Sequence, residues 1–340
     1  MSMETRRLEV KFLSPAFLGN ADQSGQWRTP PFKALLRQWW RVATAAQKHF
    51  KLDVAQLRQD EAELFGSAAG SEGKRSCLRL RLNHWSEGTL KQAQWSALGK
   101  IGQPGGKGAG VDAGLYLGYG PVELPKRKSS PTLKHNAAIQ AGEHAVLELA
   151  FPAQHAEIID QTLALIHHFG TLGGRSRNGW GSLSLGMEEG NVLAQLPLRD
   201  WRDCLDRDWV HAIGRDDRGA LVWQTAVHDD WKSMMVELAQ TRKALCSLFP
   251  VPAHSSRPEP RDWLSYPVTK HSVRGWNNLR LPNSLRFKVV EEPDGQLRAL
   301  IFHMPCLPIK KFQPNQREIE RVWQQVHAWL DHSGMKRIGG

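Results

Sequence analysis

The sequence predicts an α+β fold of two βαββαβ domains in tandem, the second of them degraded. In residues 1–190, apolar periodicities follow the order strand, helix, strand, strand, helix, strand. Residues 191–340 again combine helical patterns with a hairpin of two strands. A chain of 340 residues is also longer than most single hydrophobic cores. The order predicted for the first half is that of a ferredoxin-like, or RRM-like, domain.

The chain begins with a strand and a helix. Apolar and polar residues alternate over residues 8–13, which predicts the first strand. A polar loop follows. Thr29 is then the expected N-cap of a helix, since Pro30 is suited to the first helical position, and the apolar pattern continues to about residue 47.

Basic residues recur every four positions along this helix, at Lys33, Arg37 and Arg41, and therefore share one face. Two interpretations remain open for this face, a solvated basic stripe and a groove for RNA. Trp39 and Trp40 have the spacing of core residues, although tryptophan can also stack on bases, so their role stays open as well.

A short helix is predicted at residues 60–65, ending at Gly66, and a strand at residues 77–82 alternates apolar with basic residues. The next regular pattern begins only after a long insert, residues 99–136. A connection of this length is either functional or disordered. Its only strand candidate is residues 115–119.

The insert is basic and rich in glycine. It holds a Lys126-Arg127-Lys128 run and three further lysines, Lys100, Lys107 and Lys134, against only Asp112 and Glu123. Glycines at positions 102, 105, 106, 108 and 110 suggest a segment that orders only when it binds its ligand.

The first half closes with a strand at residues 145–151, a helix at 156–169 and a strand at 181–185, and a glycine-rich loop, residues 173–181, joins the last two. Glycine allows close approach of a ligand to the backbone, and arginine offers a planar, charged fork that suits phosphate. A turn with solvated arginines is the competing interpretation. The loop's position near the central strands favours a site for a nucleic-acid backbone.

The second half is less regular. Helices are predicted at residues 198–209, 229–249 and 316–330. Strands at residues 284–290 and 296–304 flank a turn sequence rich in Pro, Asp and Gly, which is typical of a hairpin.

Composition limits the possible functions. The chain carries 45 basic and 34 acidic residues, a net charge of +11, which favours a polyanionic partner. Four widely spaced cysteines indicate neither a zinc site nor a disulfide framework. No apolar run suits a bilayer span and no signal-peptide pattern is present, so a soluble, cytoplasmic protein is expected, with no membrane partner. No metal or cofactor is expected, because neither a face-paired carboxylate cluster nor a phosphate-loop lysine occurs.

Two stretches carry a family resemblance. The glycine-rich loop, Gly173-Gly-Arg-Ser-Arg-Asn-Gly-Trp-Gly181, resembles that of the RAMP superfamily of CRISPR RNA-binding proteins. The stretch from Arg28 to Arg41 is similar to that of the first-named RAMP subunit of type III-B (Cmr) effector complexes. Residues 64–67 and 280–287 also fit, whereas residues 190–260 fit poorly.

This resemblance implies a function. It implies a non-catalytic RNA-binding subunit of a type III-B CRISPR-Cas complex, placed at its head near the 3′ end of the guide RNA, that helps bind target RNA in antiviral defence. The implied partners are guide (CRISPR) RNA, target RNA and other RAMP subunits. The residues expected to bind RNA are Arg28, Lys33, Arg37, Arg41, Lys107, Lys126, Arg127, Lys128, Gly173, Gly174, Arg175, Arg177, Asn178 and Trp180.

An enzyme is the alternative. Some RAMP relatives cleave RNA without a metal, so this chain could be a metal-independent endoribonuclease that processes CRISPR precursor RNA. Candidate catalytic histidines are His135, His167, His168 and His271. Because a satisfied or solvated histidine is commoner than a catalytic one, we expect no catalytic residue.

Overall fold

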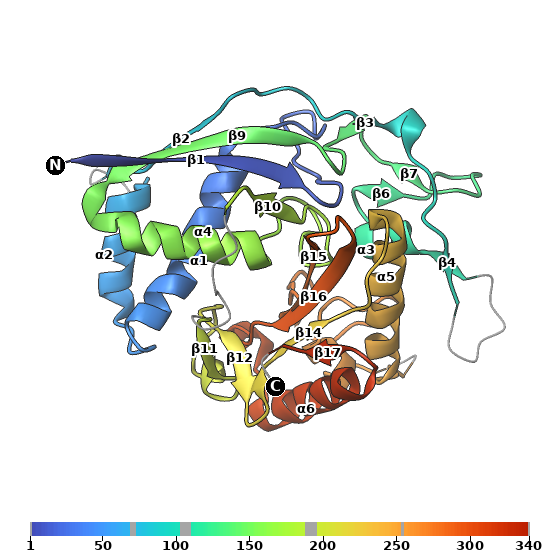
Figure 1. The fold of residues 1–340 in the computed structure, drawn as a ribbon. Coiled ribbons are helices and arrows are strands. Elements are labelled where there is room, and N and C mark those ends of the chain that lie inside the picture. The colour runs from blue at the N-terminus through green and yellow to red at the C-terminus, as the bar shows by residue number, and fades with distance from the viewer. Residues whose placement is uncertain (1, 69–72, 103–109, 188–195, 253–254, 339–340) are drawn as a thin grey trace.

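The computed structural model describes residues 2–68, 73–102, 110–187, 196–252 and 255–338, and these form a mixed α+β fold with several antiparallel sheets (Figure 1). The predicted α+β class is confirmed. Lys107, one of the expected RNA contacts, lies outside the described residues, as do residues 69–72 and 188–195.

The first half is a sheet covered by helices on one face (Figure 1). Its strands have the order β10-β1-β9-β2, and all pairs are antiparallel. The strands are β1 (Met3–Phe12), β2 (Arg79–Leu82), β9 (His144–Pro152) and β10 (Leu183–Leu185). The helices are α1 (Thr29–Gln47), α2 (Val54–Phe65) and α4 (Ala156–Phe169).

The second half repeats the same succession of elements. Strands β14 (Val222–Gln224), β15 (Leu285–Glu291), β16 (Leu297–His303) and β17 (Lys336–Arg337) form a sheet of order β15-β16-β14-β17, again antiparallel. Helix α5 (Trp231–Ser247) follows β14, and α6 (Gln316–His332) follows β16. A small sheet of β11 (Leu198–Asp200), β12 (Ile213–Asp216) and β13 (Gly219–Ala220) joins the two halves along the chain.

Local sequence explains where the helices begin. Helix α1 has prolines in its first turn, where a backbone N–H is not needed, and its N-cap is Arg28, one residue before the expected Thr29. Asp53, Asp230 and Asn315 cap α2, α5 and α6 by accepting hydrogen bonds from the backbone of the first turn.

Two segments differ from the prediction. Residues 198–209 do not form a helix, because β11 pairs with β12 and only a 3-10 turn, Asp203–Asp206, follows. Residues 115–119 do not form a strand, because residues 115–118 belong to helix α3 (Ala113–Gly118) and Tyr119 forms only an isolated bridge with Val122. The Asp112 side chain caps this helix by accepting a hydrogen bond from the N–H of Leu115 at 3.0 Å.

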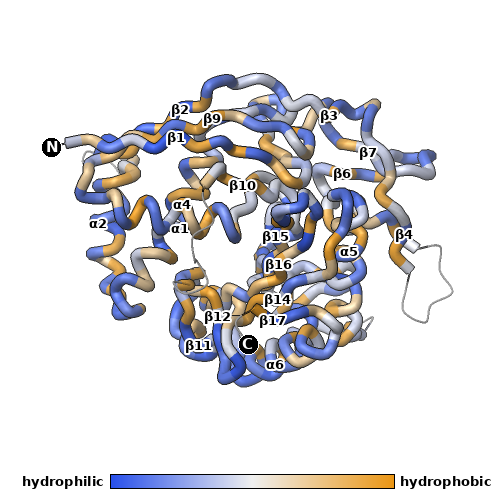
Figure 2. The backbone as a smooth tube through the Cα atoms, in the orientation of Figure 1, coloured by the Kyte–Doolittle hydropathy of each residue, from blue (hydrophilic) through white to orange (hydrophobic). Residues whose placement is uncertain are grey.

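The insert is described over residues 99–102 and 110–136, while Gly105, Gly106 and Gly108 lie outside the described residues, so ordering on binding stays a prediction. It forms the pairs β4–β5 (Lys100–Ile101 and Val111–Asp112) and β6–β7 (Val122–Glu123 and Thr132–Leu133), and the pair β3–β8 (Leu90–Lys91 and Ala137–Ala138) flanks it in the sequence. Ile101 and Leu117 anchor it, because both are fully buried in the core of the second half. The tip of the β6–β7 hairpin is hydrophilic (Figure 2).

The two halves share their hydrophobic cores. Phe302 of β16 lies 5.0 Å from the ring of Phe169 in α4 and 6.5 Å from that of Trp39. Trp39 and Trp40 are 1% and 4% exposed, and Trp40 packs on Phe65. The open question about these two tryptophans is therefore answered, because both belong to the core.

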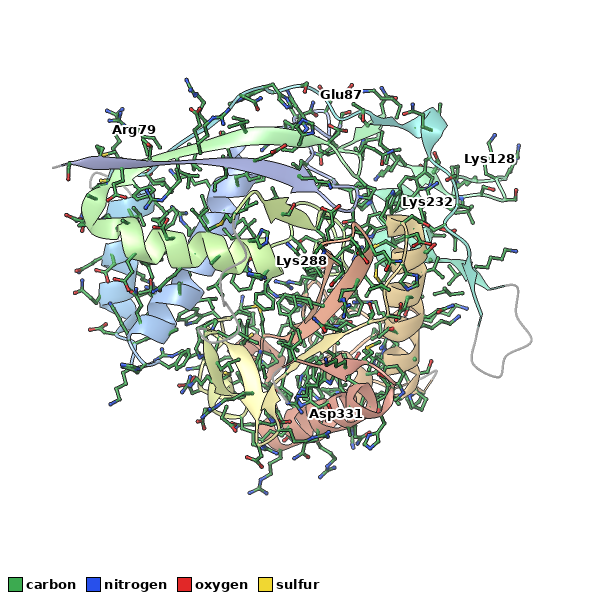
Figure 3. The ribbon with its side chains drawn as sticks, in the orientation of Figure 1. Arg79, Glu87, Lys128, Lys232, Lys288 and Asp331 are labelled. Carbon is green, nitrogen blue, oxygen red and sulfur yellow. The ribbon has the colours of Figure 1, made fainter. Side chains whose placement is uncertain are left out.

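A buried lysine also joins the halves. Lys288 of β15 is inaccessible to solvent and lies at the centre of the molecule (Figure 3). Its Nζ donates hydrogen bonds to the carbonyls of Gly170 at 2.7 Å and Ile166 at 3.4 Å, and to that of Leu183. The side-chain nitrogen therefore satisfies carbonyls at the C-terminus of α4 and in β10, and burial lowers the pKa of Lys288 well below that of an ordinary lysine.

Candidate nucleic-acid interface

The glycine-rich loop, residues 173–181, lies at the junction of the two halves. On one side it pairs with the segment after β1, because Gly174 N–H donates to the Phe17 carbonyl at 3.0 Å and Gly181 N–H to the Pro15 carbonyl at 2.8 Å. On the other side, the Arg177 carbonyl accepts a hydrogen bond from Phe287 N–H of β15 at 3.0 Å. The loop thus has fixed neighbours in both halves.

Glycine is required in this loop by the protein's own backbone. Gly173 has a φ of +98°, and a Cβ there would lie 2.8 Å from the Phe17 carbonyl oxygen. Gly181 has a φ of +64°, and its Cβ would lie 1.9 Å from the Leu172 carbonyl oxygen. Close approach of two chain segments therefore accounts for these glycines, whereas the sequence suggested close approach of a ligand.

Asn178 and Trp180 face the interior. Asn178 donates to the Leu117 carbonyl at 2.7 Å and accepts from Arg242 at 2.8 Å. Trp180 is fully buried, with its ring 5.1 Å from that of Phe17. Because neither side chain can reach RNA in this structure, we correct their assignment from RNA contacts to residues that fix the loop.

The two loop arginines differ in their surroundings. Arg175 is exposed, and its Nε donates to the Tyr119 carbonyl at 2.6 Å, so its guanidinium lies beside the insert. Tyr119 is itself 67% exposed. Arg177 is partly buried at the contact with β15, and burial lowers the pKa of its guanidinium.

A basic hairpin projects beside the loop. Lys126, Arg127 and Lys128 occupy the turn between β6 and β7, and all three are exposed. Figure 3 shows Lys128 pointing away from the body of the molecule. The base of the same hairpin contacts the loop, because a Cβ on Gly174 would lie 3.3 Å from the Pro121 side chain. Arg175 and this turn therefore offer positive charge on neighbouring elements.

The basic face of α1 lines a groove of about 1240 Å³ that involves both halves. Its basic lining residues are Lys33, Arg37, Arg41, Arg58, Lys74, Arg207 and Lys310, and its acidic ones are Glu61, Asp206 and Asp208. Apolar side chains, among them Leu57, Phe65 and Trp209, form the rest of the wall. A groove with such a lining can hold an extended chain that carries negative charge and apolar rings.

Glu61 partly neutralises this groove. It forms a bidentate ion pair with Arg41, one arm of which is 2.7 Å long, and lies 3.4 Å from Arg37 Nε. Arg37 also donates to the Gly66 carbonyl at 3.1 Å. Two arginines of the predicted basic face are therefore engaged with α2. Among the described residues, Lys33 forms no ion pair.

Arg28 connects α1 to the surroundings of the loop. Its Nη1 donates to the Gly19 carbonyl at 2.8 Å, in the same segment that pairs with Gly174. A smaller pocket lies there, lined by Gly19, Gly174 and the side chains of Lys134 and His135. The structure thus brings the loop, the insert and the start of α1 together, while the groove is centred on α1, α2 and the second half.

The candidate histidines have specific surroundings. His167 Nδ1 accepts a hydrogen bond from Leu185 N–H at 3.1 Å, and burial, followed by the nearby Lys288, lowers its pKa. His271 is buried and lies 2.8 Å from the buried Asp262. His167 and His168 are in edge-to-face contact, and His135 borders the smaller pocket. The four histidines do not converge on one site.

Within the ranges that the structure describes, no group of three or more His, Cys, Asp or Glu side chains is arranged to hold a metal ion. In the same ranges, no helix is both long enough and apolar enough to cross a membrane.

Sequence reasoning missed several basic residues near these surfaces. Arg58, Lys74, Arg207 and Lys310 line the groove, and Arg286 of β15 neighbours Arg177. None belongs to a periodic or glycine-rich motif. The only available signal was the even spread of positive charge over both halves of the chain.

Fold and site together define an α+β protein with two antiparallel sheets, a glycine-rich loop at the junction of its two halves, and basic surfaces near this junction. The family model of the RAMP superfamily matches residues 9–184. The chain belongs to this superfamily, as the resemblance of its glycine-rich loop predicted.

Among solved structures, this chain is similar to Cmr1 from Pyrococcus furiosus in its apo form. It shares 14% identity at a TM-score of 0.49, over 99% of this chain and 98% of that one. A chain of the type III-B Cmr-beta complex bound to cognate target RNA shares 12% identity at a TM-score of 0.47, over 96% and 100%. Because both scores are low, the family assignment rests on the match over residues 9–184. Among curated proteins, no sequence matches.

Proposed function

We propose that this chain is a non-catalytic RNA-binding subunit of a type III-B CRISPR-Cas (Cmr) effector complex. The observation that carries the proposal is the combination of the RAMP family match with a groove in which seven basic and three acidic side chains meet. The resemblance of residues 28–41 to the first-named RAMP subunit narrows the family to this type of complex.

The proposed fold is two ferredoxin-like domains, residues 1–190 and 191–340. Support comes from the strand orders, because numbering the strands within each half gives the order 4-1-3-2 in both sheets. Each half also has the βαββαβ succession, with an extra helix and the insert in the first. Strands β14 and β17 are only three and two residues long, which fits a degraded second domain.

The proposed partners are guide RNA, target RNA and other RAMP subunits, in a cytoplasmic complex of antiviral defence. By family analogy, the chain lies at the head of the complex near the 3′ end of the guide. Arg28, Lys33, Arg37, Arg41, Lys126, Arg127, Lys128, Gly173, Gly174, Arg175 and Arg177 remain the proposed contacts, and Lys107 stays a prediction. Phosphate contacts should dominate, which gives strong salt dependence and little sequence preference.

The proposal includes binding without cleavage. It is supported by His167, whose Nδ1 is already engaged with the backbone, and by His271, which is buried against Asp262. Incubating the purified chain with a hairpin RNA in EDTA tests this part. We expect the RNA to stay intact, whereas cleavage that disappears with His135→Ala or His167→Ala would favour the endoribonuclease.

The basic hairpin gives the first test of the RNA surface. Replacing Lys126, Arg127 and Lys128 together with alanine should lower the slope of log affinity against log salt by up to about two for single-stranded RNA, because up to three phosphate contacts are lost. Binding is measured by fluorescence anisotropy between 50 and 300 mM salt. The exposed Arg79, Arg81 and Arg7 of the outer sheet face provide a control triple variant with the same change in net charge. Equal slopes in the two variants would remove the hairpin from the RNA site.

Glu61 gives the test of the groove. Glu61→Gln keeps the side-chain shape but releases Arg37 and Arg41 from their carboxylate partner, so RNA affinity should rise by about two- to ten-fold at low salt. The matched control is Glu63→Gln, an exposed residue of the same helix. If both variants bind RNA as the unmodified chain does, the basic face of α1 is the solvated stripe that its sequence also allowed.

A further inference from the structure

Two cations project from the same face of strand β15. Arg286 and Lys288 are two residues apart, and residues at this spacing share one side of a strand. Lys288 shows which side this is, because its ammonium reaches carbonyls of α4 and β10 in the first half. Arg286 is therefore also directed into the junction of the two halves, where it is 8% exposed.

The two cations differ in how the protein satisfies them. Lys288 has three carbonyl acceptors. By contrast, the Arg286 side chain has no hydrogen bond or ion pair with any residue that the structure describes, and its buried Nε lacks a partner. A buried charge of this kind is costly unless it is paired.

Another buried arginine of this protein has the acidic partners and the carbonyl acceptor that Arg286 lacks. Arg337 of β17 is similarly shielded, yet its Nη2 contacts Asp216, and its Nε donates to the Ala220 carbonyl at 2.8 Å. Asp331 lies 3.6 Å from its Nη1. Arg286 lacks any equivalent of these carboxylates.

A charged group that acts on Arg286 is also positive. The hydrogen bond between Phe287 N–H and the Arg177 carbonyl places the glycine-rich loop beside β15, and the charge of Arg177 adds to burial in lowering the pKa of Arg286 to about 9. Arg286 is therefore still charged at neutral pH. The neighbouring thiol, Cys306, has its pKa raised by burial and is neutral there, so it supplies no counter-charge.

Cys306 links this pair of arginines to the wall of the groove, which neither arginine lines itself. Cys306, which interacts with both guanidiniums, directly precedes Leu307 and Pro308 in the groove wall. The Arg177 side chain likewise has no hydrogen bond or ion pair within the described chain. Two guanidiniums without a carboxylate, linked to a basic groove through Cys306, suit a doubly or singly charged oxyanion that accepts several hydrogen bonds.

We propose that Arg177 and Arg286 together form a phosphate-binding site between the two halves of the chain, occupied by one phosphate group of the bound RNA. The identity of the phosphate as part of RNA rests on the proposed function. The site itself does not, because inorganic phosphate presents the same oxygens. The occupant would supply the counter-charge that Arg286 lacks.

Thermal unfolding of the full chain tests the site without RNA. The midpoint is measured in sodium phosphate and in sodium chloride at equal ionic strength, for the unmodified chain, Arg286→Met and Arg337→Met. General salting effects of phosphate are shared by all three proteins. The unmodified chain should gain about 2–4 °C more from phosphate than Arg286→Met does. Arg337→Met should unfold earlier yet keep the phosphate response.

The chloride series separates a ligand site from a structural role. Because Arg286→Met removes an unpaired buried charge, its midpoint in chloride should equal or exceed that of the unmodified chain. An equal phosphate response in the unmodified chain and Arg286→Met overturns the site. A clear loss of stability in chloride overturns it as well, because Arg286 would then have a structural partner.

RNA binding by the same variants tests the identity of the occupant. Arg286→Met should weaken binding of a single-stranded RNA at least ten-fold and lower the salt slope by about one. If the phosphate response disappears but RNA affinity is unchanged, the RNA part of the inference is overturned. If the unmodified chain binds no RNA while the phosphate response depends on Arg286, the proposed function fails and the anion site stands.

Discussion

Replacing Gly181 with alanine should lower the free energy of unfolding by about 3 kcal/mol or more. Two costs combine at this position. The φ of +64° is unfavourable for a residue with a Cβ, and the added methyl group would meet the Leu172 carbonyl oxygen at 1.9 Å, so the backbone must move. Chemical denaturation followed by tryptophan fluorescence measures the change.

Gly142 provides the matched control. Its φ of +88° carries the same kind of strain, but a Cβ there has no atom within 4 Å. Gly142→Ala should therefore cost only about 1 kcal/mol. Equal losses of stability in the two variants would show that residues 181 and 172 do not lie close together in solution. The conformation that we describe for the glycine-rich loop would then be wrong.

Replacing Lys288 with methionine should have an effect of similar size, a loss of about 2–4 kcal/mol. Methionine fills a similar volume, so the core stays packed, but the carbonyls of Ile166, Gly170 and Leu183 lose a common donor at the junction of the halves. Removing the buried charge itself is favourable, which limits the loss. Arg286→Met removes a charge from the same strand face without orphaning an acceptor, so the two variants should move stability in opposite directions.

Lys128→Met is the control for the loss of a lysine as such. This residue is exposed at the hairpin tip (Figure 3), and its replacement should change the free energy of unfolding by no more than about 0.5 kcal/mol. A Lys288→Met protein as stable as Lys128→Met would mean that the ammonium does not hold the two halves together.

Elements with strong local signals could be predicted from the sequence. Apolar periodicity placed α4 at residues 156–169 and located α1, α5 and α6 to within a few residues, and the Pro-Asp-Gly turn identified the β15–β16 hairpin. The helix predicted at residues 198–209 is wrong because β11 pairs in parallel with β12, the next strand in the chain, and this pairing overrides local helix propensity.

The roles within the glycine-rich loop could not be predicted in the same way. Asn178 and Trp180 share a motif with two arginines, but only tertiary structure shows that they face Leu117, Arg242 and Phe17. Arg286 lies in the stretch 280–287 that resembles the family, but nothing in that stretch singles it out, because an isolated arginine in a strand is ordinary until its missing partner is seen. By contrast, the apolar periodicity of the residues on either side of the loop did predict that it lies between a helix and a strand.

We propose that this chain binds RNA as a subunit of a type III-B effector complex. Affinity purification of the tagged chain from its native host, followed by sequencing of the bound RNA and mass spectrometry of the bound proteins, tests this claim most directly. We predict recovery of RNA of guide length with CRISPR spacer sequences, together with other RAMP subunits. Recovery of the chain alone and free of RNA would contradict the claim.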